Sequence, residues 1–197
     1  MKNEQKIVAL VGMCGSGKSE VADVFTKAGY QYLRLGQITL DEVKHRGLEP
    51  KEENERPIRE EFRKNYGPAA FAILNFPKIE KMLANSRPVI CDGLYSWSEY
   101  KEFKKKYGDG FLVVSVFAPP KLRYARLEDR SSRYKDDPKM KYRSFSRTEA
   151  ESRDYAEIEK IEKGGPIAMA DYMLVNIRSI EELREGTNKI IQQIQND

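Results

Sequence analysis

One short segment constrains this chain more than any other: Gly12-Met13-Cys14-Gly15-Ser16-Gly17-Lys18-Ser19. It follows the spacing G-x-x-x-x-G-K-S/T, with an apolar run before it and a helical pattern, 20–28, after it. Glycines let the backbone N–H groups of such a loop surround a phosphate, and the amino end of the next helix adds partial positive charge. A chance glycine turn is the alternative, but it explains neither the spacing nor the two flanks. The segment therefore predicts a phosphate-binding loop (P-loop) for a nucleoside triphosphate.

Each side chain of such a loop has an expected role. Lys18 would reach the β and γ phosphates, and the Ser19 hydroxyl would bind Mg²⁺. Glu20, at the start of the following helix, is included in the predicted triphosphate site. A second metal ligand is expected at the end of another strand, where Asp92 follows the apolar run 88–91. An aspartate that caps a helix is the alternative for Asp92. The predicted cofactors are ATP and Mg²⁺.

Short apolar runs alternate with longer amphipathic ones along the chain. The candidate strands are 6–11, 30–35, 88–92, 111–118 and 172–176. Alternation of strands with connections of ten residues or more indicates a parallel sheet covered by helices. Helix starts of the capping-box type, a hydroxyl residue followed three positions later by glutamate, occur at Thr39, Ser96, Ser146 and Ser179. We therefore expect an α/β fold, a three-layer α/β/α sandwich around a five-stranded parallel sheet.

The positive charge is concentrated in one part of the chain. The 197 residues carry 35 basic and 31 acidic side chains, a net charge of +4, and residues 101–147 hold 14 of the basic and 6 of the acidic ones. A generally basic surface, typical of nucleic-acid-binding proteins, is therefore not expected. The longest apolar stretch, 111–118, is too short for a membrane helix, which needs roughly 18–20 residues. With no signal-peptide pattern at the amino terminus, we expect a cytoplasmic protein without membrane or nucleic-acid partners.

Four arginines of the basic segment share one helical face: Arg123, Arg126, Arg130 and Arg133. Guanidinium groups bind phosphate oxygens through paired hydrogen bonds, and a polar stretch, 131–145, follows. We therefore expect a lid over the transferred phosphoryl group, with Arg126 and Arg130 as catalytic residues. The alternative is an ordinary solvated face whose arginines pair with Glu128 and Asp129.

The stretch 36–87 is too long for a simple crossover and should contain two or three helices. Arg59 and Arg63 share a helical face within it, and together with Arg34 at a strand end they could hold an anionic acceptor. Surface arginines paired with nearby glutamates are an equal alternative. Tyr95 either stacks on a planar substrate or fixes the helix that follows it.

These features together resemble the nucleoside monophosphate kinase group of P-loop proteins. The resemblance rests on the P-loop, on Asp92-Gly93, on Arg126-x-x-x-Arg130 and on Ala170-Asp171-Tyr172-Met173-Leu174-Val175-Asn176. Within that group the chain is most similar to the adenylate-kinase-related proteins of archaea, which also resemble dephospho-CoA kinase. Arg46-Gly47-Leu48-Glu49-Pro50 and Arg153-Asp154 are typical of this subgroup. The resemblance covers essentially the whole chain.

The resemblance implies a P-loop NTPase fold with strand order 2-3-1-4-5 and a single kinase domain. The implied parts are a core at 1–35, 88–125 and 148–197, a helical acceptor-binding insertion at about 36–87 and a lid at about 126–147. Asn176 would lie on the adenine side of ATP. The residues on the acceptor side would be Arg34, Gly36, Arg59, Arg63, Gly93, Tyr95 and Arg153.

The chain departs from the group at three places. Leu94-Tyr95-Ser96 follows Asp92-Gly93, where adenylate kinases have an aromatic residue, a proline and an arginine. Residues 34–37 contain no carboxylate, whereas dephospho-CoA kinases carry their base after the second strand. The late loop, 176–179, lacks the glycine of near relatives.

We predict an ATP-dependent phosphotransferase that moves the γ-phosphoryl group of ATP to a small phosphorylated acceptor, in the first place a nucleoside monophosphate. Such chemistry requires positioning of the reactants and neutralisation of charge rather than covalent help from the protein. A dephospho-CoA kinase-like activity, a regulatory or assembly ATPase without a small-molecule acceptor, and nucleic-acid binding are the alternatives. The expected assembly is a monomer or a homodimer.

Overall fold

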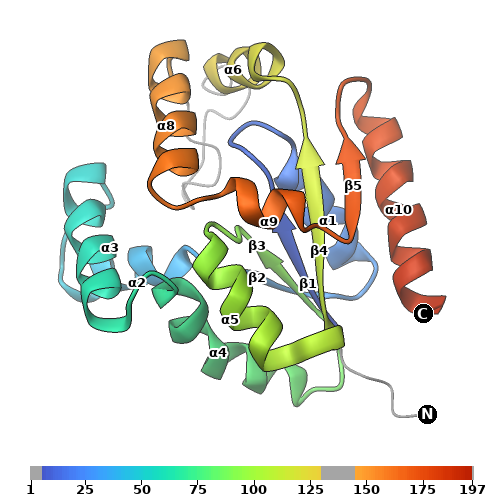
Figure 1. Cartoon of the computed structure of the whole chain (residues 1–197), viewed down its shortest axis with the longest axis horizontal. Helices are drawn as coiled ribbons and strands as arrows, with labels where there is room; N and C mark the ends of the chain where they lie inside the picture. Colours follow the sequence, from blue (N-terminus) through green and yellow to red (C-terminus); the bar gives the residue numbers. More distant parts are fainter. Residues whose placement is uncertain (1–5, 130–144, 197) are drawn as a thin grey trace.

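A computed structural model describes residues 6–129 and 145–196, and a sheet of five parallel strands runs through them (Figure 1). The strands are β1 Ile7–Val11, β2 Gln31–Arg34, β3 Val89–Asp92, β4 Phe111–Phe117 and β5 Tyr172–Val175. Their order across the sheet is β2-β3-β1-β4-β5, and all neighbouring pairs are parallel. The predicted fold class and strand order are confirmed, and the predicted strands lie within one residue of the observed bounds.

Helices cover both faces of this sheet, α1 (Lys18–Lys27) and α10 (Ile180–Asn196) on one side, and α4 (Ala70–Leu83), α5 (Trp97–Tyr107) and α9 (Gly164–Ala168) on the other. Every residue of β1 is buried, as a central strand covered on both faces requires. Phe25 and Ile191 belong to the core on the first side, and Ile79 and Phe103 to the core on the second. The chain thus forms the predicted three layers.

The remaining helices stand around the carboxyl ends of the strands (Figure 1). Residues 36–87, all of which are described, contain α2 (Gln37–His45), α3 (Glu52–Tyr66) and α4, so the expectation of two or three helices is confirmed. Helices α6 (Pro120–Glu128) and α8 (Arg147–Glu159) follow β4, and a single 3-10 turn, Gly108–Gly110, precedes it. The predicted lid lies largely outside the described residues, and the division into core, insertion and lid stays a prediction.

The helices of the described residues include none with the length and apolar character that crossing a membrane requires.

Serine side chains cap three of the helices, as predicted. The hydroxyls of Ser96, Ser146 and Ser179 accept hydrogen bonds from the backbone N–H three residues further on, at 3.1, 3.3 and 3.1 Å. The prediction for Thr39 is wrong, because α2 begins two residues earlier and Gly36 is its N-cap residue. Thr39 therefore lies inside the helix, and its side chain is buried.

The carboxylate of Glu99, in the first turn of α5, is buried close to two cations, Arg63 and Lys163. It accepts a hydrogen bond from the Tyr95 backbone N–H at 2.9 Å, and the residue is 1% exposed. Burial raises the pKa of Glu99 from its ordinary 4.5 to about 7, although that hydrogen bond and the charges of Arg63 and Lys163 act in the opposite direction. Between these two values the folded chain binds more protons at Glu99 than the unfolded chain does.

The stability of the protein should therefore contain a contribution from Glu99 that is present below pH 4.5 and is lost as the pH rises to about 7. A shift from 4.5 to about 7 corresponds to roughly 3 kcal/mol. Glu99→Gln keeps an oxygen for the Tyr95 N–H and removes the charge, so the free energy of unfolding should lose this decline. Urea denaturation from about pH 5 to about pH 8 measures it.

The matched control is Glu149→Gln, at the same capping position of α8 but on the surface, and it should retain the wild-type decline. A decline that persists unchanged in Glu99→Gln contradicts the role given to the buried carboxylate.

Candidate active site

A cavity of about 1300 Å³, here named the cleft, lies where residues that follow β1, β2, β3 and β5 meet. Ligands of parallel α/β sheets bind at this edge, outside the carboxyl ends of the strands. The predicted site residues that line the cleft are Cys14, Gly15, Gly17, Lys18, Ser19, Glu20, Arg34, Gly36, Arg59, Arg63, Asp92, Gly93, Tyr95, Arg126, Arg153 and Asn176. Gly12, Met13 and Ser16 are not part of the lining, and Arg130 lies outside the described residues.

Two glycines of the P-loop occupy places where a side chain has no room. Gly12 has φ of 142°, and a Cβ atom there would be 2.3 Å from the Val116 carbonyl oxygen of β4. Gly17 has φ of 109°, and its Cβ atom would be 2.3 Å from Nδ2 of Asn176. The close approach explains the glycines at these positions of the motif, because it brings the loop against both β4 and the residue after β5.

The Lys18 side chain lies along the P-loop. Its Nζ donates hydrogen bonds to the carbonyl oxygens of Gly12 at 2.8 Å and Met13 at 3.1 Å. Burial and the nearby positive charge of Lys163 lower the pKa of Lys18 to about 8, although Cys14 and Asp92 favour the charged form. A polyanion bound in the cleft would counteract both effects and keep Lys18 charged.

Asp92 and Ser19 bring two oxygen ligands to the same cleft. The Tyr32 hydroxyl donates a hydrogen bond to Oδ2 of Asp92 at 2.9 Å, a contact between neighbouring strands that the sequence did not indicate. No group of three or more His, Cys, Asp or Glu side chains suited to a metal occurs in the described part of the chain. A hydroxyl and one carboxylate fit Mg²⁺, which takes few protein ligands and completes its shell with phosphate oxygens and water.

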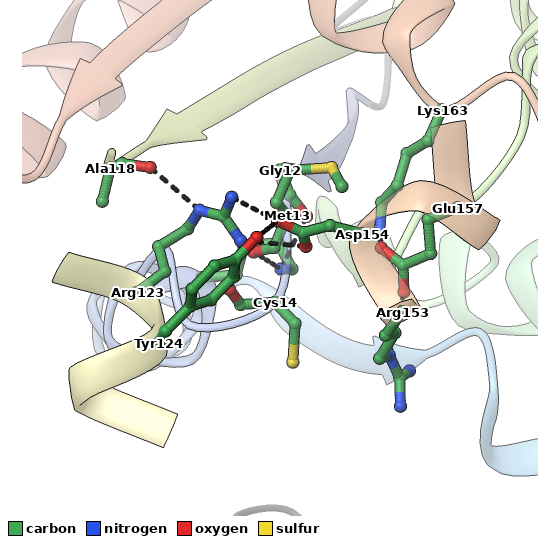
Figure 2. Close-up of polar contacts among 11 residues, drawn as sticks. Gly12, Met13, Cys14, Ala118, Arg123, Tyr124, Arg153, Asp154, Glu157 and Lys163 are labelled. Atoms are coloured by element: carbon green, nitrogen blue, oxygen red, sulfur yellow. Dashed lines mark hydrogen bonds and ion pairs between the residues drawn. The ribbon is translucent and has the colours of Figure 1, made fainter. Parts of the chain in front are cut away.

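Arg123 points into the protein and not toward a ligand (Figure 2). Its guanidinium contacts both carboxylate oxygens of Asp154, at 2.9 and 2.5 Å, and donates to the carbonyl oxygens of Ala118 at 2.9 Å and Cys14 at 3.1 Å. The interpretation of Arg123 as part of a phosphate-facing stripe is therefore wrong. The reason is that α6 packs this side of the helix against α8 and the P-loop.

Arg126 lies on the P-loop side of the cleft, together with Asn176. Its Nη2 donates to the carbonyl oxygen of Asn176 at 3.2 Å and to the side-chain oxygen of Asn176 at 3.3 Å. Asn176 in turn donates from Nδ2 to the carbonyl oxygen of Ser16 at 2.8 Å. These bonds link α6, the segment after β5 and the P-loop. Glu20, at the edge of the cleft, pairs with Arg184 of α10 at 3.1 Å.

The opposite wall of the cleft comes from α2, α3 and the start of α4. Arg59 pairs with Glu52 and Glu55, as the alternative interpretation expected. Arg63 differs, because it stacks over the Phe71 ring at 5.3 Å and forms no ion pair within the described residues. The buried Thr39 hydroxyl also lines the cleft and has no hydrogen-bond partner among them. This wall therefore offers donors to a ligand.

Tyr95 lies across two glycines on this side of the cleft. Its hydroxyl oxygen is 3.3 Å from the place of a Cβ atom on Gly36 and 3.0 Å from that on Gly93, whose φ is 92°. Both glycines leave room for the tyrosine, and the Tyr95 and Phe71 rings are in edge contact at 6.4 Å. The Tyr95 ring thus forms the surface of the cleft between the P-loop and the wall that comes from α2, α3 and the start of α4.

Two further charged residues of the cleft, Glu157 and Lys163, have no sequence motif that reveals them. Glu157 binds Arg153 at 3.1 Å and Lys163 at 2.6 Å (Figure 2). Burial would raise the pKa of Glu157, but the charges of Lys163 and Arg153 outweigh it and lower the pKa to about 2. Lys163 belongs to the turn between α8 and α9, so its approach to the P-loop depends on tertiary packing alone.

Comparisons with known proteins agree with this geometry. A family described as an AAA domain matches residues 8–154. A UPF0200 protein from Thermococcus kodakarensis is 36% identical over 189 residues, which cover 95% of this chain and 97% of that protein. Shikimate kinase from Bacteroides thetaiotaomicron has a TM-score of 0.58 and 15% identity, over 96% of this chain and 98% of its own. Dephospho-CoA kinase from Campylobacter jejuni has a TM-score of 0.51 and 16% identity, over 97% of this chain and 98% of its own.

At these low identities the two solved structures show a likeness of fold. They share the P-loop kinase architecture, to which the five parallel strands in the order 2-3-1-4-5 and the flanking helices correspond. The sequence matches reach further, because they span more than half of the chain in one case and nearly all of it in the other. The chain therefore belongs to the UPF0200 family, a P-loop family similar to the nucleoside monophosphate kinases.

Proposed function

We propose that the protein is an ATP-dependent kinase that transfers the γ-phosphoryl group of ATP to a small acceptor, in the first place a nucleoside monophosphate. One observation carries the proposal: the cleft joins the P-loop to a second wall that has a cation of its own, Arg63, and Arg34 at the end of β2 also lines the cleft. A triphosphate on one wall leaves the other for a second anionic reactant. The similar folds named shikimate kinase and dephospho-CoA kinase support a small-molecule acceptor.

The P-loop side has the groups that phosphoryl transfer requires. Lys18 would exchange its hydrogen bonds to the loop carbonyls for oxygens of the β and γ phosphates. Ser19 and Asp92 would hold Mg²⁺, which neutralises charge on these phosphates when bound. Arg126, anchored beside the P-loop through Asn176, would stabilise charge that develops on the transferred group. Arg130 keeps its predicted role in the lid as a prediction from the sequence.

A regulatory or assembly ATPase without a small-molecule acceptor is the second candidate. It is favoured by the pairing of Arg59 with Glu52 and Glu55, which occupies one of the cations expected to hold an acceptor. A dephospho-CoA kinase-like activity is a variant of the first candidate, but residues 35–37, just after β2, supply no carboxylate as a base.

Phosphate transfer from ATP and Mg²⁺ to a panel of nucleoside monophosphates, dephospho-CoA and shikimate separates these candidates. A kinase should release ADP in proportion to one acceptor and yield its phosphorylated form. Slow hydrolysis that is indifferent to every acceptor would support the ATPase and contradict our proposal.

Lys18→Ala should abolish turnover, because the β and γ phosphates lose the ammonium that neutralises them. A loss of at least 10²–10³-fold in kcat is expected for a group that stabilises transferred charge. Steady-state kinetics with ATP measures it, and Lys27→Ala, an exposed lysine at the end of the same helix, should be unaffected. Turnover that survives in Lys18→Ala places catalysis elsewhere.

Arg126→Ala should lower kcat by roughly 10²–10³-fold with a much smaller change in the KM for ATP, because its donor acts on charge formed in the transition state. The control is Lys121→Ala, an exposed cation on the same helix. If the KM for ATP rises and kcat stays constant, Arg126 binds the nucleotide and takes no part in the transfer.

A further inference from the structure

A buried lysine, Lys163, lies on the acceptor side of the cleft. It is 2% exposed and is part of the cleft lining. Its Nζ is 5.1 Å from the centre of the Tyr95 ring and donates to Oε2 of Glu157 at 2.6 Å. Buried lysines are rare because an ammonium group loses its hydration, so the position requires an explanation.

The turn that carries Lys163 is held firmly against the start of α5. The Trp97 backbone N–H donates to the Ile161 carbonyl oxygen at 3.4 Å, and the Lys163 N–H to that of Glu157 at 3.1 Å. Gly165 packs so closely on Trp97 that a Cβ atom would be 2.8 Å from the indole. The ammonium group is thereby fixed above Tyr95 before any ligand arrives, which reduces the entropy cost of binding.

Lys163, Arg153 and Lys18 bring three positive charges close together at this point. Lys163 and Arg153 share the single carboxylate of Glu157. Lys18 is close enough for the Lys163 charge to lower its pKa, so the two ammonium groups repel each other. Glu99 is a further carboxylate near this lysine, but burial raises its pKa to about 7, so below that pH it is largely uncharged. An incoming anion would therefore meet favourable positive charge here.

A second cation lies over the other ring of the same aromatic pair. Tyr95 and Phe71 are in edge contact at 6.4 Å, and the Arg63 guanidinium lies over Phe71 at 5.3 Å. Burial lowers the pKa of Arg63, which reports its partial desolvation. Lys163 and Arg63 thus each lie over one ring of the Tyr95–Phe71 pair, and both line the cleft.

We propose that Lys163 and Arg63 bind an oxyanion of the acceptor, a phosphate or a carboxylate, above the Tyr95–Phe71 pair, at a subsite separate from the triphosphate on the P-loop. The subsite rests on the proposed kinase function for its place in the reaction, but its binding can be measured without turnover. Lys163 is accordingly an acceptor-binding residue, and Glu157 is the residue that positions it.

Calorimetric titration of inorganic phosphate into the protein saturated with Mg²⁺ and the β,γ-imido analogue of ATP tests the subsite, because the analogue occupies the P-loop. Phosphate should bind the wild-type complex. Lys163→Ala should weaken that binding by roughly 10–100-fold, the loss expected for a charge-assisted hydrogen bond, and Lys163→Arg should retain most of it. Acetate in place of phosphate identifies a carboxylate preference.

Two further variants separate binding from a structural role. Lys101→Ala removes an exposed lysine that also lies over a ring, Trp97 at 5.9 Å, and should leave phosphate affinity unchanged. Glu157→Gln keeps a side-chain oxygen that can accept the hydrogen bond that positions Lys163, but it removes the negative charge that opposes an anion. It should therefore tighten phosphate binding, whereas a purely structural ion pair would lose stability without that gain. If Lys163→Ala does not fold, the phosphate affinity of Glu157→Gln tests the subsite in its place.

The outcomes distinguish the subsite from the kinase proposal. Phosphate that does not bind once the analogue fills the P-loop, or that binds folded Lys163→Ala as tightly as wild type, overturns the subsite whatever the acceptor panel shows. Binding that depends on Lys163 supports the subsite even if no acceptor is phosphorylated. Where an acceptor is found, Lys163→Ala should raise its KM by more than it lowers kcat.

Discussion

The buried ion pair between Arg123 and Asp154 holds together the parts of the chain that form the cleft. Arg123 is 4% and Asp154 6% exposed, and the guanidinium also binds carbonyl oxygens of the P-loop and of the segment after β4. The Tyr124 hydroxyl adds a third donor to the carboxylate at 3.0 Å. Because removal of one partner leaves an uncompensated buried charge, α6, α8 and the P-loop are constrained to keep their relative places. The placement of the P-loop thus depends on helices that are distant from it in the sequence.

Helix α8, which carries Asp154 of this ion pair, also positions charged side chains of the cleft. Residues one position apart on a helix point in different directions, whereas residues four apart share a face. Asp154 therefore faces Arg123, while its neighbour Arg153 and, one turn later, Glu157 face the cleft. Glu157 then orients Lys163. The buried contact of Asp154 with Arg123 fixes the orientation of α8, and with it the positions of Arg153 and Glu157 in the cleft. The site is preorganised in this way.

Local patterns are sufficient to predict the P-loop, the strands and three of the four capping boxes, because these depend on neighbouring residues. Arg123 and Arg126 are both arginines on one predicted helical face. Only the packing of α6 shows that Arg123 is buried and that Arg126 lies in the cleft. The predicted capping box at Thr39 is wrong because the N-cap residue of α2 is Gly36. Lys163 follows no periodic pattern, since the turn that carries it reaches Tyr95 through contacts between distant segments.

The internal carboxylates of the cleft make its charge selective. Glu157 holds Arg153 and Lys163, and Glu52 and Glu55 hold Arg59, so a ligand with one negative charge must compete with groups already in place. A ligand with several negative charges gains more, because it also offsets the burial and the repulsion by Lys163 that together lower the pKa of Lys18 to about 8. Discrimination of this kind comes from the local balance of cations and carboxylates in the cleft and not from the net charge of +4 of the whole chain. In the proposed kinase these glutamates would therefore contribute to the recognition of a triphosphate and its acceptor, since without them any small anion could neutralise the cleft.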